Sequence, residues 1–489
     1  MTLILKHFLL LCVSLVLSGV ALAERPQIEW ARTYGNPAGE EVCTCAIQSA
    51  NGSVLCTGNI WDPGTGSLDA FLVCIDANGD SLWCHTYGGP GAESAGRIIQ
   101  TPDLGYLLSA STSPNGIEEE EYIWLIKTNA EGDTEWTRTY DEGEVFQEFG
   151  VIASTSDGGY ILAGERISLD MTRDDALLMK LDPFGNREWS SSFSGDSAGG
   201  FSSVVQTADG GYLMSGAVQI NDQSLWGGWA MKTNADGDSL WGHRYHADTQ
   251  SQVVAARQTP DGGYILAESA NRAMWLIKLD TSGATSWERS YYFPGTLTDA
   301  ACRSMIALPD SGFLLAGFAF SISPHTSHDM YIVRTDAIGD SLWTMTIGDT
   351  ALWEECMTAT RCQDNGFVFS GLAGAGPGGF HIMVVKTTPE FHSAVTPETP
   401  LRPATFTLSN FPNPFNPSTW ISFDLPQAGN VSLKVFDVLG REVSTLSTTA
   451  MAAGAHYVLF NGEGLASGTY VVRLEAGHEA RTVKILLLK

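Results

Sequence analysis

The chain has 489 residues, of which 44% are hydrophobic and 17% charged, with 52 glycines and 14 tryptophans. This composition excludes a disordered chain and a long coiled coil, and it favours β structure. The formal net charge is −28, from 55 acidic and 27 basic side chains. Such a surface repels phosphate, which argues against nucleic acid as a partner.

The first 23 residues predict a signal peptide. Lys6 and His7 precede an apolar run over residues 8–20, and Ala21, Leu22 and Ala23 give the small-x-small pattern of a signal peptidase site. The run is shorter than the ~20 residues that a spanning helix needs, and no later run is long enough. We therefore expect export to the periplasm, a mature chain that begins near Glu24, and no integral membrane segment.

Seven tryptophans recur at intervals of 46 to 56 residues, and most open a similar segment such as WARTYG or WTRTY. They are Trp30, Trp83, Trp136, Trp189, Trp241, Trp287 and Trp343. A residue that occurs once per repeat is expected to pack between neighbouring repeats rather than to bind a ligand.

Two turns recur in fixed order between these tryptophans. One has the form TPDGGYIL, as at Thr259, and the other has the form Asp/Asn-x-x-Gly, as in KLDTSGATSW at Lys278. Both turns favour hairpins, so each repeat encodes four short antiparallel strands, the size of a propeller blade. The hairpin turns number seven, which predicts an all-β, seven-bladed β-propeller over residues 24–391. Because the last repeat lacks its Trp strand, the first strand is expected to complete it and to close the ring.

The segment KLDPFGNREW, residues 180–189, resembles the strand-to-Trp repeat of quinoprotein-type propellers and also the Asp-box of sialidases. Its spacing differs from both by one residue. Neither resemblance carries catalytic residues to this chain.

A linker and a second domain follow the repeats. Residues 392–405 include the Pro-containing stretch TPETPLRPAT, and residues 406–489 balance six basic against six acidic side chains. This tail contains PNPFNPST, DVLGREV and GTYVVRL. It resembles the C-terminal sorting domain of proteins exported by the type IX secretion system, and the related Ig-like fold of the flagellar hook-assembly protein. The resemblance implies a small Ig-like β-sandwich that the secretion machinery recognises, with delivery to the cell surface or the medium.

The connections between the second and third strands of the repeats indicate where binding is expected. The connections that begin at Asn59, Thr112, Arg166, Gln219 and Ser321 vary in length and sequence, whereas the hairpin turns at the opposite end are uniform. Variable loops on a rigid scaffold usually carry binding. Five acids precede or open the innermost strands on this side: Glu41, Glu93, Glu148, Glu354 and Glu355. A ring of these carboxylates would suit Ca²⁺ or a cationic ligand, and solvated acids that aid solubility are the alternative.

His325, His328 and Asp329 form an H-x-x-H-D cluster, a weak candidate for a metal site because no third ligand is defined. The sequence holds no nucleophile elbow, zinc-protease helix or phosphate loop. We therefore expect a surface or extracellular binding protein without catalytic activity or an assigned cofactor, whose ligand is a glycan or a protein. A secreted enzyme acting on polysaccharide and a structural or adhesive protein remain alternatives.

Cys74 takes the register that Lys127, Lys180 and Lys232 hold in other repeats, and Cys84 follows Trp83 on the next strand. If the two cysteines lie opposite each other across the hairpin, their separation suits a disulfide. The sequence thus predicts a Cys74–Cys84 bridge in the oxidising environment outside the cytoplasm.

Overall fold

The computed structural model describes residues 23–488 apart from 36–40, 63–65, 90, 114–121, 141–144, 147–149, 169–173, 194–198, 221–224, 247–248, 294–297, 322–327, 349–351, 375–378, 393–405, 412, 416, 426, 428, 452–453 and 478. The predicted signal peptide, except its last residue, and nearly all of the predicted linker lie outside the described residues. The chain divides into two compact units, and Leu22–Ser393 forms the larger one.

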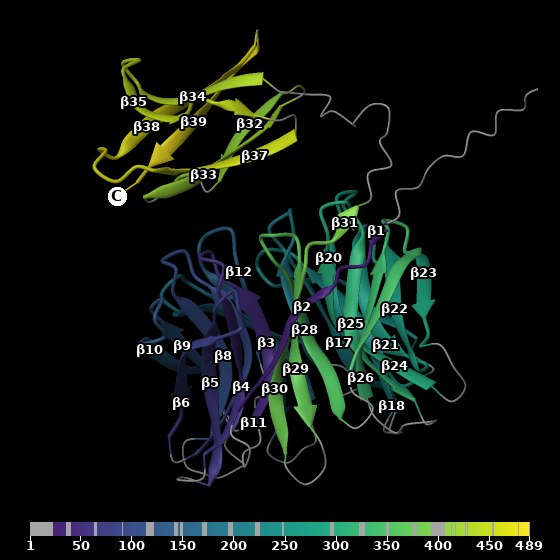
Figure 1. Cartoon of the computed structure of the whole chain (residues 1–489). Helices are drawn as coiled ribbons and strands as arrows, with labels where there is room; N and C mark the ends of the chain where they lie inside the picture. The colour runs from purple at the N-terminus through teal and green to yellow at the C-terminus, as the bar shows by residue number, and fades with distance from the viewer. Residues whose placement is uncertain are drawn as a thin grey trace, which may run out of the picture. The chain divides into compact units, whose positions relative to one another are not determined.

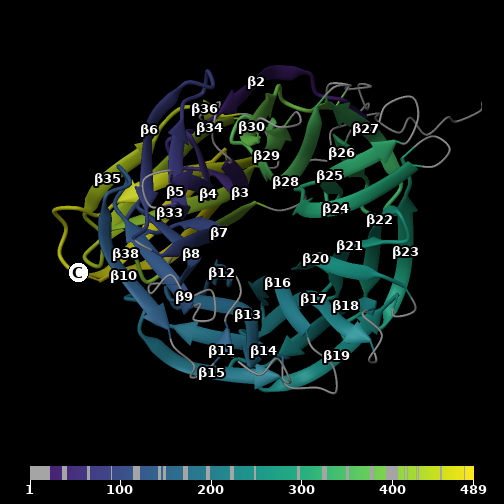
Figure 2. The same ribbon diagram turned by 90° about the horizontal axis from the view of Figure 1, so that it is seen from below.

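The larger unit is an all-β propeller. Among the described residues, seven antiparallel sheets share one strand order and surround a central axis (Figures 1 and 2). The innermost strands are β3 (Glu41–Gln48), β7 (Ala92–Gln100), β12 (Val151–Ser154), β16 (Gly199–Gln206), β20 (Ser251–Gln258), β24 (Thr298–Ala307) and β28 (Trp353–Arg361). The second strands are β4 (Val54–Asp62), β8 (Tyr106–Ser113), β13 (Tyr160–Ser168), β17 (Tyr212–Ile220), β21 (Tyr264–Ala270), β25 (Phe313–Ser321) and β29 (Phe367–Gly374).

The outer half of each sheet follows the same plan. The third strands are β5 (Ser67–Ile75), β9 (Tyr122–Thr128), β14 (Asp174–Leu181), β18 (Leu225–Thr233), β22 (Ala273–Leu279), β26 (His328–Thr335) and β30 (Phe380–Thr387). The outermost strands are β6 (Ser81–Tyr87), β10 (Thr134–Tyr140), β15 (Arg187–Phe193), β19 (Ser239–Tyr245), β23 (Thr285–Tyr291), β27 (Ser341–Ile347) and β2 (Ile28–Tyr34). The short β11 (Val145–Phe146) also pairs with β13, and β1 (Ala23–Glu24) pairs with β31 (Phe391–His392).

The first strand of the repeats closes the ring. β2 pairs with β30 in the sheet β2-β30-β29-β28, which joins the start of the propeller to its end. Gln27 and Thr388 reinforce the junction through a backbone hydrogen bond of 2.8 Å from Thr388 N to Gln27 O. The expectation that the N-terminal strand completes the last sheet is confirmed.

The recurring tryptophans pack between neighbouring sheets, as expected. Each of six indoles lies against the positive-φ glycine in the outer hairpin turn of the next sheet. A Cβ added at Gly185, for example, would lie 2.7 Å from Cη2 of Trp136. In five of these six cases a tyrosine four residues later donates a hydrogen bond to the same glycine carbonyl, as from Tyr140 to Gly185 at 2.5 Å; Phe193 takes this position after Trp189. Trp343 faces the closure instead, where its Nε1 donates to Glu390 at 2.8 Å.

Buried cations hold the two hairpins of most sheets together. Lys180 and Lys232 are buried in the third strand, and each reaches the aspartate of the inner hairpin turn: Lys180 lies 2.8 Å from Asp157 and Lys232 lies 2.9 Å from Asp209. Lys127, Lys278, Arg334 and Lys386 make the same pair in their sheets. The first sheet lacks this ion pair, because Asn51 occupies the position of the aspartate and Cys74 that of the lysine.

These ion pairs predict acid sensitivity. Burial alone raises the pKa of Asp157 and Asp209, but hydrogen bonds, including those from Lys180 and Lys232, outweigh it and lower each pKa to about 2. A depressed carboxyl pKa contributes stability that is complete above the unfolded-state value near 3.9 and is lost as pH falls toward 2. Replacing one pair with Asp209→Asn and Lys232→Met should therefore make the acid-induced fall in melting temperature shallower. We expect about 1 kcal/mol or less per pair, since the carboxylates are solvent-exposed.

The measurement is thermal unfolding at pH values from 7 to 2. The control is Asp236→Asn, which removes an exposed carboxylate of the same sheet without touching an ion pair with Lys232. If the double variant loses stability with the same pH profile as the wild type, the pairs do not carry the acid response.

The smaller unit includes Ala394–Lys489 and has its own core. One sheet contains β32 (Thr407–Phe411), β33 (Ser418–Leu425) and β37 (Gly454–Asn461). The other contains β34 (Gly429–Asp437), β35 (Glu442–Ser447), β36 (Ala450–Met451), β38 (Gly468–Ala476) and β39 (Glu479–Leu487). Buried residues of both sheets, such as Phe423, Phe460 and Val472, belong to one hydrophobic cluster, so the unit is a β-sandwich.

The predicted disulfide is wrong. Cys74 lies opposite Trp83, and Cys84 lies opposite Val73, so the two cysteines are one residue out of register across this hairpin. Side chains of successive residues point to opposite faces of a sheet, so the two thiols are directed to opposite faces. Cys74 is buried, Cys84 is exposed, and both are free.

Candidate functional site

The innermost strands enclose a channel along the axis of the propeller. Its wider section, which we call the loop-end cavity, has a volume of about 620 Å³. Gly96 and Arg97 in the middle of β7 line it, with residues of the first half of β16 and β20, Ala217 in β17 and Trp226 at the start of β18. This is the end of the propeller where the variable loops were expected to build a binding face. The second section, the turn-end cavity, has a volume of about 510 Å³ and shares Arg97, Ser202 and Arg303 with the first.

A β-bulge at one level of the innermost strands shapes the lining. The register shifts between Ala95 and Arg97 in β7, and the same shift recurs in β3, β16, β20, β24 and β28. Bulges insert an unpaired residue and redirect side chains. The inserted residues Thr44, Gly96, Ser202 and Arg303 line the loop-end cavity.

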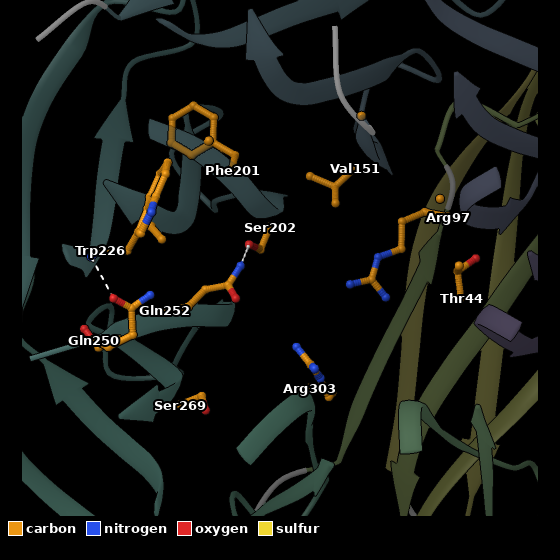
Figure 3. Close-up of a pocket in the computed structure, with 15 residues that line it drawn as sticks. Thr44, Arg97, Val151, Phe201, Ser202, Trp226, Gln250, Gln252, Ser269 and Arg303 are labelled. Carbon is orange, nitrogen blue, oxygen red and sulfur yellow. Dashed lines mark hydrogen bonds between the residues drawn. The ribbon is translucent and has the colours of Figure 1, made fainter. Parts of the chain in front are cut away.

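Neutral polar groups and aromatic rings make up much of this wall. Gln252 Nε2 donates to Ser202 Oγ at 2.8 Å, and the backbone N of Trp226 donates to Gln250 Oε1 at 3.0 Å. Phe201 stacks on Trp229 with ring centroids 4.9 Å apart. Hydrogen bonds thus hold the two amide side chains in place, as Figure 3 shows.

Arginine is the main charged residue of the channel. Arg97 and Arg303 direct their guanidinium groups into the same space (Figure 3). Arg257 and Arg361 join them on the lining of the turn-end cavity. Sequence reasoning missed these four residues, although basic side chains on the innermost strand of a repeat in so acidic a chain are a signal that was available.

The structure places the predicted acids elsewhere. Glu41, Glu93, Glu354 and Glu355 are buried, and none of the four lines either cavity. Glu93 accepts hydrogen bonds from Gly89 N and Thr112 Oγ1, both at 3.1 Å. Glu41 and Glu355 face histidines of the preceding sheet, with 3.3 Å from His381 Nδ1 to Glu41 and 2.7 Å from His328 Nδ1 to Glu355. Glu148 lies outside the described residues. These buried carboxylates connect strands and sheets rather than ring the channel.

The histidine cluster has a similar role. The His328 ring stacks on Phe318 at 4.7 Å and contacts Trp353 at 4.0 Å between centroids. Asp329 follows it in β26, and His325 lies outside the described residues. Within the described part of the chain, no group of three or more His, Cys, Asp or Glu side chains is arranged to hold a metal ion. The same part contains no helix with the length and apolar character needed to span a membrane.

Solved structures resemble the propeller only distantly. PorZ, described as an essential bacterial surface component of the type-IX secretion system of Porphyromonas gingivalis, is 13% identical over 91% of this chain, with a TM-score of 0.44. This chain spans 59% of the length of that protein. The β-propeller domain of the Trilobed protease from Pyrococcus furiosus is 10% identical over 74% of this chain and 99% of that chain, with a TM-score of 0.42. A polysaccharide lyase described as an ulvan lyase is 8% identical over 73% of this chain and 96% of that chain, with a TM-score of 0.47.

No curated protein matches the sequence. Residues 409–488 match the family described as "Secretion system C-terminal sorting domain", and this match agrees with the resemblance of the tail. The chain is therefore an all-β propeller protein whose C-terminal sandwich belongs to the sorting domains of the type IX secretion system.

Proposed function

We propose that this protein is a binding protein of the cell surface or the extracellular space, with its ligand in the loop-end cavity of a seven-bladed propeller. In this proposal the signal peptide directs the chain to the periplasm, and the mature chain begins near Glu24. The Ig-like sandwich at residues 406–489 then passes it to the type IX machinery. The ligand is a glycan or a protein outside the cell.

The loop-end cavity is the observation that carries this proposal. Its volume of about 620 Å³ lies within the range of small-molecule sites, and most of its wall belongs to paired strands, as in a preformed site. Gln250, Gln252 and Ser202 offer hydrogen-bond donors and acceptors, and Trp226 offers an apolar face. This combination of polar groups and an apolar face suits recognition of one end of a ligand.

The chemistry of the wall favours binding over catalysis. Among the described residues, arginine is the only titratable type on the loop-end lining, and the turn-end lining adds one cysteine, Cys45. Arginine stays protonated at every physiological pH, so it does not act as a general acid or base. We therefore propose that the protein binds its ligand without converting it.

One observation favours a polysaccharide-acting enzyme as the second candidate. His328 and Glu355 form a pair at 2.7 Å, and Glu355 lies 3.7 Å from Arg303 on the cavity wall. A histidine–carboxylate pair next to a cavity is a common acid–base arrangement. Product release from polysaccharides that is lost in a His328→Gln variant would establish this candidate.

Filling the loop-end cavity tests the binding proposal. A Cβ added at Gly96 meets its nearest neighbour at 3.5 Å, an ordinary contact, so Gly96→Phe fits the backbone and places a ring at the cavity. We expect retention of the full exported chain on an immobilised array of neutral and acidic glycans to be lost in Gly96→Phe.

The matched control is Gly242→Phe on the outermost strand β19, where the added Cβ also meets its nearest neighbour at 3.5 Å. The control should bind as the wild type does. Equal binding by Gly96→Phe would place the ligand outside the cavity, and the absence of any retained glycan would count against a glycan ligand altogether.

A further inference from the structure

The channel has the opposite charge to the rest of the protein. The chain carries 55 acidic and 27 basic side chains. The described residues that line the two cavities nevertheless include four arginines and neither aspartate nor glutamate. Among these described lining residues, arginine is thus the only charged type.

Four different innermost strands supply these arginines. Arg97 lies in β7, Arg257 in β20, Arg303 in β24 and Arg361 in β28. Arg303 is itself the inserted residue of a bulge, and Arg97 directly follows one. The bulges therefore help to direct guanidinium groups into the channel from separate sheets (Figure 3).

These arginines differ from the other buried cations in their partners. Lys127, Lys180 and Lys232 each lie within 2.9 Å of an aspartate. Within the described residues, neither Arg97 nor Arg257 forms an ion pair with a carboxylate. Arg257 donates instead from Nη1 to Ala256 O at 2.7 Å and to Ser203 Oγ at 3.5 Å. The other buried cations of the fold have carboxylate partners. The charges of Arg97 and Arg257 are therefore available to an anion from outside the chain.

Arg303 supports the same conclusion. Its Nε is buried without a hydrogen-bond partner in the described part of the chain, and its Nη2 forms a long ion pair of 3.7 Å with Glu355, which leaves it without a hydrogen bond to that carboxylate. The guanidinium also lies over the Phe318 ring at 5.3 Å. The ring holds the group in place and leaves its donors available to a ligand.

Repulsion between like charges adds to this imbalance. Burial and the neighbouring charge of Arg97 lower the pKa of Arg257. Repulsion between these two cations opposes folding, and an anion bound between them would relieve it. Ligand binding and stability of the propeller are therefore coupled.

We propose that the channel binds an anionic saccharide, whose carboxylate or sulfate groups pair with Arg97, Arg257 and Arg303. This inference rests on the proposed binding function and names its ligand class. The neutral wall selects a saccharide over other anions, because Gln250, Gln252 and Ser202 match sugar hydroxyls and Trp226 offers a face for a sugar ring. Planar guanidinium groups bind carboxylate and sulfate oxygens in pairs.

The test compares matched probes on the full exported chain. Short dextran sulfate and neutral dextran of the same length differ only in the anion, and oligogalacturonate and its methyl ester provide the carboxylate equivalent. Calorimetric titration should show binding of the two acidic probes that weakens as salt increases, and no binding of the neutral ones. Arg97→Gln and Arg303→Gln should each weaken the acidic probes about tenfold or more.

Arg138→Gln is the control, because Arg138 lies on the outermost strand of the sheet that holds Arg97 and its loss changes the net charge equally. It should leave affinity unchanged. Thermal unfolding gives a second readout. Arg97→Gln should keep or raise the melting temperature without ligand, because it removes repulsion on Arg257, and the acidic probes should raise the melting temperature of the wild type more than that of the variant.

Three results would overturn the inference. Equal binding of dextran and dextran sulfate would support the proposed binding function but exclude recognition of the anionic groups. Acidic probes that bind Arg97→Gln and Arg138→Gln equally well would place the anion site outside the channel. Arginine-dependent binding of poly-glutamate, but of no saccharide, would make the ligand an acidic peptide.

Discussion

Deleting Ile28–Tyr34 should destabilise the propeller by more than about 5 kcal/mol and broaden its thermal unfolding. The deletion removes β2, the outermost strand of the closing sheet, and leaves the edge of β30 unpaired. It also removes the buried Trp30, which packs against Gly79 of the neighbouring sheet. Loss of a buried tryptophan alone costs about 3–5 kcal/mol. The measurement is calorimetric unfolding of the full and shortened chains.

Two point variants test how much of this loss of stability comes from the buried Trp30. Trp30→Ala should lose a large part of the stability that the deletion loses. Arg32→Ala, at an exposed position of the same strand, should lose almost none. Unchanged melting of the deleted chain would mean that pairing of β2 with β30 does not close the ring.

Removal of residues 406–489 should abolish delivery to the cell surface in a host with a working type IX system. The match of residues 409–488 to secretion sorting domains is the basis for this expectation. The sandwich has a hydrophobic cluster of its own, and the propeller forms a separate compact unit. We therefore expect the shortened chain to accumulate in the periplasm with the propeller folded. Fractionation of cells, with proteolysis of intact cells to detect surface protein, measures the outcome.

A point variant in the core of the sandwich tests whether sorting needs the folded domain rather than only the full chain length. Leu433→Asp, which buries an unpaired charge in the β-sandwich, should also block delivery while it keeps every residue in place. Leu439→Asp, the same change at an exposed position, should have little effect. Normal surface delivery of the shortened chain would remove the sorting assignment.

The repeat sequence contained enough information to predict the propeller. The spacing of Trp30 to Trp343, the two kinds of hairpin turn and the missing last strand each follow from local chemistry that every repeat shares. The Asp–Lys pairs also follow the repeat, and even the paired loss at Asn51 and Cys74 is visible as a departure from it. Features that recur in each sheet are predictable, because the same residue pattern appears in many repeats of the sequence.

The channel was not predictable in the same way. Its shape depends on bulges, which shift the register by one residue and leave no strong mark in a single sequence. The pairing of Cys74 with Trp83, which leaves Cys84 one residue out of register, rules out the disulfide. The arginines each occur on one strand without a repeat, so only the ring brings Arg97, Arg257 and Arg303 to one space. The acids near the loops were predicted to line the channel, but Glu41 and Glu93 are buried within the fold.

The central claim, an anion-binding channel at the axis of an exported propeller, is tested most directly by a crystal structure of the full exported chain with a short acidic oligosaccharide. We predict density for the saccharide in the loop-end cavity, with a carboxylate or sulfate within hydrogen-bond distance of Arg97 or Arg303. Saccharide density confined to the outer surface of the propeller or to the sandwich, with the cavity filled only by water, would contradict the account.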